Sequence, residues 1–572
     1  MAKRRNRFVV TPSVNKPRST FGLPFSHKMT FNSGKLIPVG CIEVVAGDTL
    51  DLKLNNVTRM LVPAVPVMDN CVLDIFHFWV PFRLCTKHAD DWQKIHGENV
   101  ESYWANDTEY TLANTGNTYS GYEENEDEEQ IGGFEDNTVT INSVAAYLGY
   151  PVGNYYSASN PHLSMLPLRA YLRIWNEYFR DENLQAPLEF DGTDISFMTS
   201  YAGNSFLPVA KLHDKYTSCL PAPQKGNAVS LFAGLGIIPV TTGGTADIHN
   251  MGTTPLYLGP SSGNNSQHLV LEGASGDAIK NNASPIGGFN ATTGVTITTN
   301  GITRSNLQVK LEDATDVLTV NDLRIRFAIQ KALERDARGG TRFRELLRAH
   351  YGVTIPDLVV QNAEYLGGSH SILNMDTVLQ TSQTDTTPLG TTGAYSNTSI
   401  KDNGFIKSFV EPGLIMTLVC VRPIQTYGQG IPRLLFKTNR FDYFYPVFSN
   451  IGEQPIYKKE LFVGSASQMI TDNPEIFGYN EAWVDYRHLE NRVSGALRPD
   501  SGDATMSAWT YSNYFGSQPS LNNEFIIQPS NQIGRTLVDV NTTTQFVADF
   551  YFNIKATREM PVFSIPGNID HF

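Results

Sequence analysis

The stretch "FVADFYFNIKA", residues 546–556, decides the fold class of this 572-residue chain. Its apolar side chains occupy every second position. They are Phe546, Ala548, Phe550, Phe552 and Ile554, and the polar face carries Asp549, Tyr551, Asn553 and Lys555. Because side chains of a β-strand point alternately to opposite faces, this period of two predicts a strand buried on one face.

Two further strands are predicted near the other end of the sequence. "TLDLKLN" (residues 49–55) alternates in the same way, with Leu50, Leu52 and Leu54 on one face. "VLDIFHFWVPF" (residues 72–82) is apolar on both faces, as in a strand covered on both sides, and His77 within it is expected to be a hydrogen-bonded core histidine. Strands near both ends, with most of the chain between them, predict a mainly β fold with long loop insertions.

Three helices are predicted within these insertions. The first follows Pro167 and places Leu168, Tyr171, Leu172, Trp175 and Phe179 on one stripe. The second begins near Asp322, with Ile325 and Ile329 on its apolar face, and the pair Gly339 and Gly340 ends it. The third ends at Gly352.

Two segments are read as insertions in the chain. Residues 101–137 are acidic and short of aliphatic side chains, and they lack the spacing of an EF-hand, which favours a solvated loop over a calcium site. Residues 227–319 mix Gly, Asn and Thr with short apolar runs, which predicts a subdomain of small strands and turns. Such an insertion is expected to project outward and to carry recognition.

Charge is distributed unevenly along the chain. The formal net charge is −13, which argues against a free nucleic-acid-binding protein. The residues before Glu43 are nevertheless purely basic, and this set comprises Lys3, Arg4, Arg5, Arg7, Lys16, Arg18, Lys28 and Lys35. Residues 1–40 are therefore predicted to form an arm that seeks phosphate or an acidic partner, with a solubilising tail as the alternative.

The sequence contains none of the motifs that would predict a cofactor, a metal site or an enzyme. Its five cysteines are scattered and lack CxxC spacing, which indicates reduced thiols in a protein made in the cytoplasm. Walker A, HExxH, GxSxG and dinucleotide-binding patterns do not occur. No apolar run approaches the length of a transmembrane helix, and the first residues lack the apolar stretch of a signal peptide.

One stretch concentrates charged and aromatic residues: "GYNEAWVDYRHLENRVSGALRP", residues 478–499. Its candidate functional residues are Glu481, Trp483, Asp485, Tyr486, Arg487 and Arg492. Glu481 and Asp485 could act as the paired carboxylates of a glycosidase. Paired charges beside large aromatic side chains are equally typical of a protein interface.

Many stretches across the sequence carry a family resemblance. They include "FNSGKLIPVGCIEVVAGDT", "VPAVPVMDN", "FHFWVPFRL", "RAYLRIWNEYFRDENLQ", "LPAPQKG", "DLRIRFAIQKALERDARGGTRFRELLRAHYGV", "AEYLGGS", "RPIQTYGQGIPR", residues 478–499 and "PVFSIPGNIDHF". In their order and spread they resemble the major capsid proteins of the Microviridae, in particular of the gokushoviruses. The segment between Gly226 and about Leu318 is the least similar.

The resemblance implies an eight-stranded antiparallel jelly roll in a small icosahedral shell, with one copy per asymmetric unit, around circular single-stranded DNA. Residues 1–40 would face the interior, with Lys3, Arg4, Arg5, Arg7, Lys16 and Arg18 toward the DNA. Residues 41–226 and 320–572 would build the jelly roll and its helical loops, and residues 227–319 a protrusion at each threefold axis. Glu481, Trp483, Asp485, Tyr486, Arg487 and Arg492 would then lie between copies.

The resemblance also implies partners and a location. Other virion proteins, scaffolding proteins and a host surface receptor, with a glycan as one candidate, would contact this chain. The protein would be assembled in the cytoplasm of a host bacterium and reside in the virion. Two alternatives remain at this stage: a β-rich polysaccharide hydrolase that uses the carboxylates near Trp483, and a carbohydrate-binding adhesin that uses residues 227–319.

Overall fold

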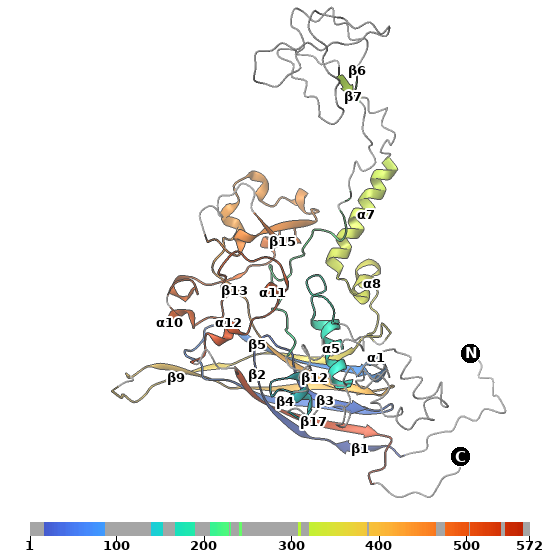
Figure 1. The fold of residues 1–572 in the computed structure, drawn as a ribbon, viewed down its shortest axis with the longest axis vertical. Helices are drawn as coiled ribbons and strands as arrows, with labels where there is room; N and C mark the ends of the chain where they lie inside the picture. Colours follow the sequence, from blue (N-terminus) through green and yellow to red (C-terminus); the bar gives the residue numbers. More distant parts are fainter. Residues whose placement is uncertain are drawn as a thin grey trace, which may run out of the picture. The chain divides into compact units, whose positions relative to one another are not determined.

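A computed structural model gives the fold of the chain (Figure 1). It describes residues 17–85, 139–152, 166–188, 206–227, 229, 240–242, 307–309, 320–357, 359–385, 388–464, 475–502, 504–538 and 544–563. The chain divides into two compact units, of which the first comprises residues 1–226 and 333–572 and the second residues 227–332.

The first large sheet joins the two ends of the described chain. It contains β1 (Ser19–Gly22), β2 (Phe25–Phe31), β4 (Thr49–Met60), β11 (Thr398–Ser408) and β17 (Phe546–Arg558), and the strand order is β1-β17-β4-β11 with β2 also beside β17. All pairs are antiparallel. The register runs on from β1 to β2, because Gly22 lies opposite Lys555 and Phe25 opposite Phe552. The two strands therefore form one interrupted edge of the sheet.

The second large sheet is also antiparallel. Its order is β3-β12-β5-β8, formed by β3 (Ile37–Val44), β12 (Gly413–Pro423), β5 (Cys71–Pro81) and β8 (Glu364–Ile372). Nearly every residue of β5 and β12 is buried. The prediction of a strand covered on both faces is therefore confirmed for residues 72–81.

The main core draws on both sheets. One cluster combines Leu50, Leu52 and Leu54 of β4 and the alternate apolar residues of β17 with Ile37 and Ile415 of the second sheet. These side chains are 0–3 % exposed, which confirms the predicted period of two. Full burial of each large side chain stabilises the fold by roughly 1.5–3 kcal/mol.

Polar groups inside this sandwich are paired. His77 is fully buried; its Nε2 lies 2.8 Å from Asp402 Oδ2 and its Nδ1 lies 2.9 Å from Thr417 Oγ1. The prediction of a hydrogen-bonded core histidine is confirmed. Gly40 lets the backbone of β3 approach Phe552, since a Cβ at this glycine would lie 2.8 Å from the ring.

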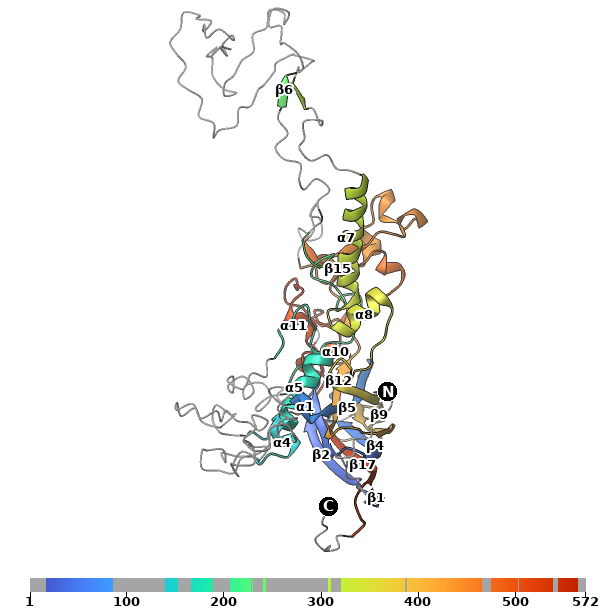
Figure 2. The ribbon, with the colours of Figure 1, turned by 90° about the vertical axis from the view of Figure 1, so that its right-hand side faces the viewer.

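Helices cover the other face of the second sheet (Figure 2). They are α4 (Val144–Leu148) and α5 (Leu166–Ile174), and α5 continues into a π-helical turn, Trp175–Phe179. Tyr171 is fully buried, and its hydroxyl donates to the Leu36 carbonyl at 2.8 Å. The predicted first helix and its buried stripe are confirmed, and the π-turn is an addition that the spacing did not indicate.

The two later helices also lie where the sequence predicts them. They are α7 (Val320–Gly339) and α8 (Phe343–Tyr351). The helices end at Gly340 and Gly352, whose φ angles of 87° and 69° favour glycine. The expected apolar stripe of α7 is not packed in a core, because Ile325 and Ile329 are 49 % and 46 % exposed.

The remaining helices and strands are short. They are α1 (Phe82–Cys85), β6 (Val240–Thr242), β7 (Leu307–Val309), β9 (Met375–Leu379), β10 (Thr392–Ser396), β13 (Thr426–Tyr427), β14 (Glu453–Tyr457), β15 (Ile476–Glu481), β16 (Asn491–Arg492), α10 (Ala504–Ser507), α11 (Asn523–Ile526) and α12 (Asn531–Gly534). No helix among the described residues is long and apolar enough to span a membrane. All five cysteines are free thiols.

The segment boundaries expected from the sequence need adjustment. Residues 19–31 lie in β1 and β2, so they belong to the first sheet rather than to an arm that extends to residue 40. The second unit begins at Asn227, as the expected subdomain does, but includes residues 320–332 of α7 as well. In that subdomain the pair of β6 and β7 is described. The acidic segment 101–137 lies outside the described residues.

Candidate assembly surface

A hairpin and a strained turn position the residues of the 478–492 stretch. β14 and β15 pair antiparallel, and Glu453, the first residue of β14, lies opposite Glu481, the last residue of β15. Just beyond it, Trp483 has a φ of 64°, a left-handed conformation that costs a non-glycine residue roughly 1–2 kcal/mol. Its backbone N–H donates to Gln454 Oε1 at 3.1 Å, and its indole N–H donates to the Phe448 carbonyl at 3.0 Å. The chain therefore turns sharply into the 3-10 turn Val484–Tyr486.

The indole of Trp483 is packed by its own chain. It is 8 % exposed, and the rings of Phe444, Tyr486 and Phe448 lie 5.7, 6.2 and 6.4 Å from it between centroids. Tyr486 is 54 % exposed, and its hydroxyl accepts a hydrogen bond from the Phe444 backbone N–H at 3.3 Å. Trp483 thus supports the more exposed rings beside it.

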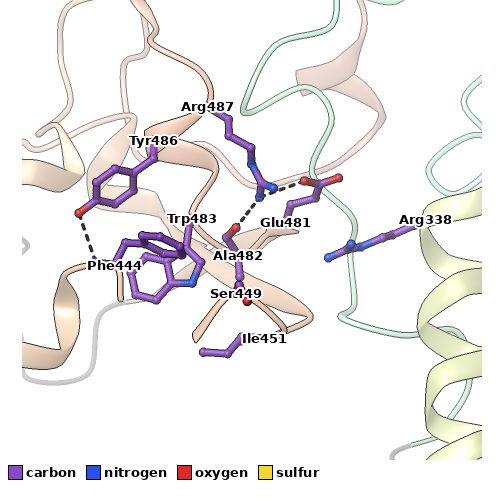
Figure 3. A pocket seen from close by; sticks show the side chains of 9 residues that line it. All are labelled: Arg338, Phe444, Ser449, Ile451, Glu481, Ala482, Trp483, Tyr486 and Arg487. Atoms are coloured by element: carbon purple, nitrogen blue, oxygen red, sulfur yellow. Dashed lines mark hydrogen bonds and ion pairs between the residues drawn. The ribbon is translucent and has the colours of Figure 1, made fainter. Parts of the chain in front are cut away.

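Glu481 and Arg487 form an exposed ion pair at the mouth of a pocket (Figure 3). Their charged atoms lie 3.0 Å apart, with the two side chains 49 % and 57 % exposed. Arg487 also donates to the Ala482 carbonyl at 2.5 Å. Arg338 of α7 lines the same pocket, which has a volume of about 310 Å³ and is also lined by Trp483 and Tyr486.

Asp485 is held by a buried lysine. Its Oδ2 lies 2.5 Å from the Nζ of Lys437, whose side chain is 5 % exposed and lies over the Tyr486 ring at 4.3 Å. Burial opposes the charge of Lys437, but the hydrogen bond and ion pair with Asp485 outweigh it and raise the lysine's pKa. Each carboxylate therefore already has its own cation, and the two do not share a site as a glycosidase pair would.

A ridge of exposed apolar side chains lies next to this pocket in residues 434–451. We call these residues, "LLFKTNRFDYFYPVFSNI", the aromatic ridge. Its most exposed members are Leu434, Leu435, Phe441 and Val447, at 67, 71, 67 and 87 %. The backbone here forms single 3-10 turns, Arg433–Phe436, Arg440–Asp442 and Pro446–Phe448, which provide no second face on which to bury the apolar residues.

Buried charges anchor the start of the ridge. Glu460, fully buried, lies 2.7 Å from Lys215 Nζ and 3.2 Å from a guanidinium nitrogen of Arg433. Tyr216, whose hydroxyl donates to the Glu460 carbonyl at 3.2 Å, belongs to a buried apolar cluster with Tyr427, Phe477 and Phe525. Removing one partner of such a buried pair is strongly destabilising, so the base of the ridge is fixed while its apolar side chains face solvent.

The structure brings together four of the six residues expected at an interface. Glu481, Trp483, Tyr486 and Arg487 line the pocket, and Asp485 reaches it through Lys437 under Tyr486. Arg492 lies on β16, pairs with Glu490 at 3.5 Å and does not line the pocket. Among the described residues no group of three His, Cys, Asp or Glu side chains could hold a metal ion.

Comparison with known proteins identifies the family to which the chain belongs. The family model described as "Capsid protein (F protein)" of phages matches residues 10–568. The chain belongs to this family. Proteins named "Capsid protein VP1" from Bdellovibrio phage phiMH2K, Chlamydia phage 1 and Spiroplasma virus 4 are each 32 % identical to it. The alignments cover 99, 98 and 96 % of this chain and 98, 98 and 95 % of the respective relatives.

Membership of the capsid family settles the class of function. The chain is a structural major capsid protein of a Microviridae phage and a component of the virion, with full-length relatives among the gokushoviruses. The resemblance seen in the sequence is confirmed. The hydrolase alternative is wrong, which agrees with the separate cation partners of Glu481 and Asp485.

Of the six basic residues expected to face DNA in this capsid protein, only Arg18 is described. It is exposed just before β1, and its guanidinium donates to the Gly47 carbonyl at 2.5 Å. Lys3, Arg4, Arg5, Arg7 and Lys16 lie outside the described residues.

No regular pattern in the sequence of the capsid protein indicates the aromatic ridge. Its apolar residues follow neither a period of two nor a helical period, so searching for strands and helices passes over them. The signal that could have found it is the density of aromatic residues, since Phe441, Tyr443, Phe444, Tyr445 and Phe448 fall within eight positions without periodicity.

Proposed function

We propose that this chain self-associates into a small icosahedral shell, one copy per asymmetric unit, that encloses a circular single-stranded DNA genome. The observation that carries this proposal is the aromatic ridge. Its large apolar side chains are exposed one after another within a single segment, and apolar surface gathered in this way usually marks a contact with another protein. In a capsid protein, the partner that fits is another copy of the same chain.

We further propose that the two large sheets form an eight-stranded jelly roll. The strand orders support it once β1 and β2 are counted as one interrupted strand, which leaves four strands in each sheet. The first strand then lies beside the last, β17, and β3 lies beside the penultimate long strand, β12. This nested order is what the double Greek key of a jelly roll produces.

The pocket beside the ridge supplies charge for such contacts. Arg487 and Glu481 are exposed and oppositely charged, so a neighbouring copy could exchange ion pairs with them and fix its orientation. Tyr486 offers an exposed ring held by Trp483, and aromatic and arginine side chains are the residues favoured in interface cores. In this proposal Asp485 holds Lys437 beneath the Tyr486 ring, and Arg492 lies beside the contact on β16.

The remaining assignments concern the basic amino-terminal residues and the internal segment 227–319. The basic residues Lys3, Arg4, Arg5, Arg7, Lys16 and Arg18 are proposed to neutralise packaged DNA inside the shell, because cationic arms bind phosphate without sequence preference. Residues 227–319 are proposed to project outward at the threefold axes and to contact a host receptor, with a glycan as one candidate. Scaffolding and other virion proteins are proposed partners in assembly.

The test replaces one exposed ridge residue by a charged one. Val447→Asp is expected to abolish particles seen by sedimentation and negative-stain imaging, because an aspartate would be desolvated in an apolar contact. The subunit should stay folded, since exposed substitutions usually change stability by less than about 0.5 kcal/mol. Ile406→Asp, at a residue 71 % exposed on β11, is the matched control and should leave assembly intact. Normal particles of Val447→Asp with nuclease-resistant DNA would contradict the ridge's role.

A further inference from the structure

A second, larger pocket lies apart from the aromatic ridge, within the first unit. Lys211 lines it together with residues between 499 and 535, some of them in α11 and α12, and its volume is about 790 Å³. About half of the lining residues are neutral polar ones, such as Asn513, Gln518 and Asn531, and the rest include Phe515, Phe525 and several prolines. The wall therefore offers both hydrogen-bonding groups and apolar surface to a ligand.

Lys211 is the least expected residue of this wall. It is 4 % exposed, and its Nζ lies 4.5 Å from the centroid of the Phe525 ring. Among the described residues its ammonium makes no hydrogen bond or ion pair, and the charge of Asp214 acts on it only from a distance. The nearby carboxylate of Asp214 instead accepts hydrogen bonds from the Tyr427 hydroxyl at 2.5 Å and from the backbone N–H of Tyr216 at 2.8 Å.

Burial lowers the pKa of Lys211 to about 8, and Asp214 opposes that shift. The side chain is therefore still mainly protonated at neutral pH. A buried ammonium without a directly bonded counter-ion is costly, and the aromatic face and the more distant charge of Asp214 offset only part of that cost, since the pKa stays lowered. The pocket consequently favours an anionic guest beside Lys211.

Arg535 adds a second cation to the same pocket. Its guanidinium donates to the Thr510 carbonyl at 2.8 Å and to the Ser512 carbonyl at 2.6 Å, which are neutral acceptors. No ion pair of Arg535 occurs among the residues that the structure describes. Glu524 is the one carboxylate residue of the lining, and it is solvent-exposed. The lining thus carries two cations and one acidic side chain, while the charges of Asp214 and Asp69 act on Lys211 and Arg535 from outside the lining.

We propose that this pocket binds a phosphate group of single-stranded nucleic acid, with Lys211 as the phosphate ligand and Tyr514 as a stacking surface for an adjacent base. The proposal rests on the proposed function, in which the shell encloses DNA. Tyr514 lines the pocket and is 59 % exposed. A cavity of about 790 Å³ exceeds the space that one phosphate needs, and bases of any sequence stack on aromatic side chains.

The test measures affinity for a fluorescent oligodeoxythymidylate by anisotropy, with the unassembled subunit and with inorganic phosphate as competitor. Lys211→Met should weaken oligonucleotide binding about tenfold or more, a factor typical of losing one charged contact. Lys401→Met removes the same charge from an exposed position on β11 and should bind like the wild type. Lys211→Met removes a buried unpaired cation, so it should melt no lower than the wild type.

A second variant separates nucleic acid from free phosphate. Tyr514→Ala should weaken oligonucleotide binding but leave competition by inorganic phosphate unchanged. The proposal is overturned if both variants bind the oligonucleotide like the wild type, or if Lys211→Met loses phosphate binding alone. Particle formation is scored separately, in the presence of the other virion and scaffolding proteins. Particles from the wild type and from Lys211→Met keep the proposed function intact whatever the pocket binds, and absence of particles from the wild type would count against the proposed function itself.

Discussion

The sandwich core and the aromatic ridge are both rich in large apolar side chains, but they use them in opposite ways. In β4 and β17 these residues alternate with polar ones, and Leu52 and Phe550 are completely buried. In residues 434–451 they follow one another without a period, and Val447 is 87 % exposed. Periodic placement lets one chain bury its own apolar surface, whereas aperiodic placement leaves that surface for a partner.

The largest effect on subunit stability is expected from a substitution in the sandwich core. Phe552 is fully buried, stacks on Phe25 at 4.5 Å between centroids and contacts Gly40. Phe552→Ala should lower the free energy of unfolding by about 3–5 kcal/mol, because a cavity would remain between the sheets. Chemical denaturation of the unassembled subunit measures this loss. A decrease below about 1 kcal/mol would mean that the sheets close without this side chain.

A smaller loss of subunit stability, together with a loss of assembly, is expected at Trp483, which is buried like the core but packs beneath exposed rings. Trp483 is packed inside its own chain while it supports Tyr486 of the exposed surface. Trp483→Ala should cost about 2–4 kcal/mol of subunit stability and also reduce assembly, since its truncation removes core packing.

The measurement for Trp483→Ala pairs a denaturation curve with sedimentation of assembled material. Trp483→Phe is the matched control, because it keeps most of the ring packing and loses the hydrogen bond to Phe448. A stable Trp483→Ala subunit that fails to assemble would instead place Trp483 directly in the contact between copies.

The smallest effect is expected for the exposed ion pair. Glu481 and Arg487 lie 3.0 Å apart but are about half exposed, so Arg487→Gln should change subunit stability by less than about 1 kcal/mol. Its effect should appear in assembly, as a changed dependence on salt concentration. Light-scattering assembly assays over a salt series would measure it. Identical salt dependence in wild type and variant would remove this pair from the contact.

The parts of the fold that sequence could predict are those with a simple period. The alternation in residues 546–556 and 49–55, the doubly buried strand at 72–82 and the glycine stops after α7 and α8 follow from local chemistry. The partner of each strand does not, because pairing Phe31 with Phe546 depends on residues more than 500 positions apart. The end of the basic arm was also placed too late, since Lys28 and its neighbours form a strand.

The candidate site shows a similar division. The sequence of residues 478–492 shows the charged and aromatic composition of the site, but it does not show which of these side chains are buried. Trp483 is turned inward by a left-handed backbone conformation, and such a conformation cannot be predicted at a tryptophan from sequence alone. Lys211 likewise became notable only when the fold buried it in the wall of a pocket, where its ammonium lies over the Phe525 ring.

The position of β17 has a consequence for synthesis. This strand is the central partner of both β1 and β2 on one side and of β4 on the other. The early strands therefore leave the ribosome long before their shared neighbour exists, and contacts of such large sequence separation form slowly. The first sheet can close only after residue 558 has been translated. Until then β4 lacks its neighbour on one side, and that unpaired strand edge has to be kept from pairing with other chains while the subunit is being made.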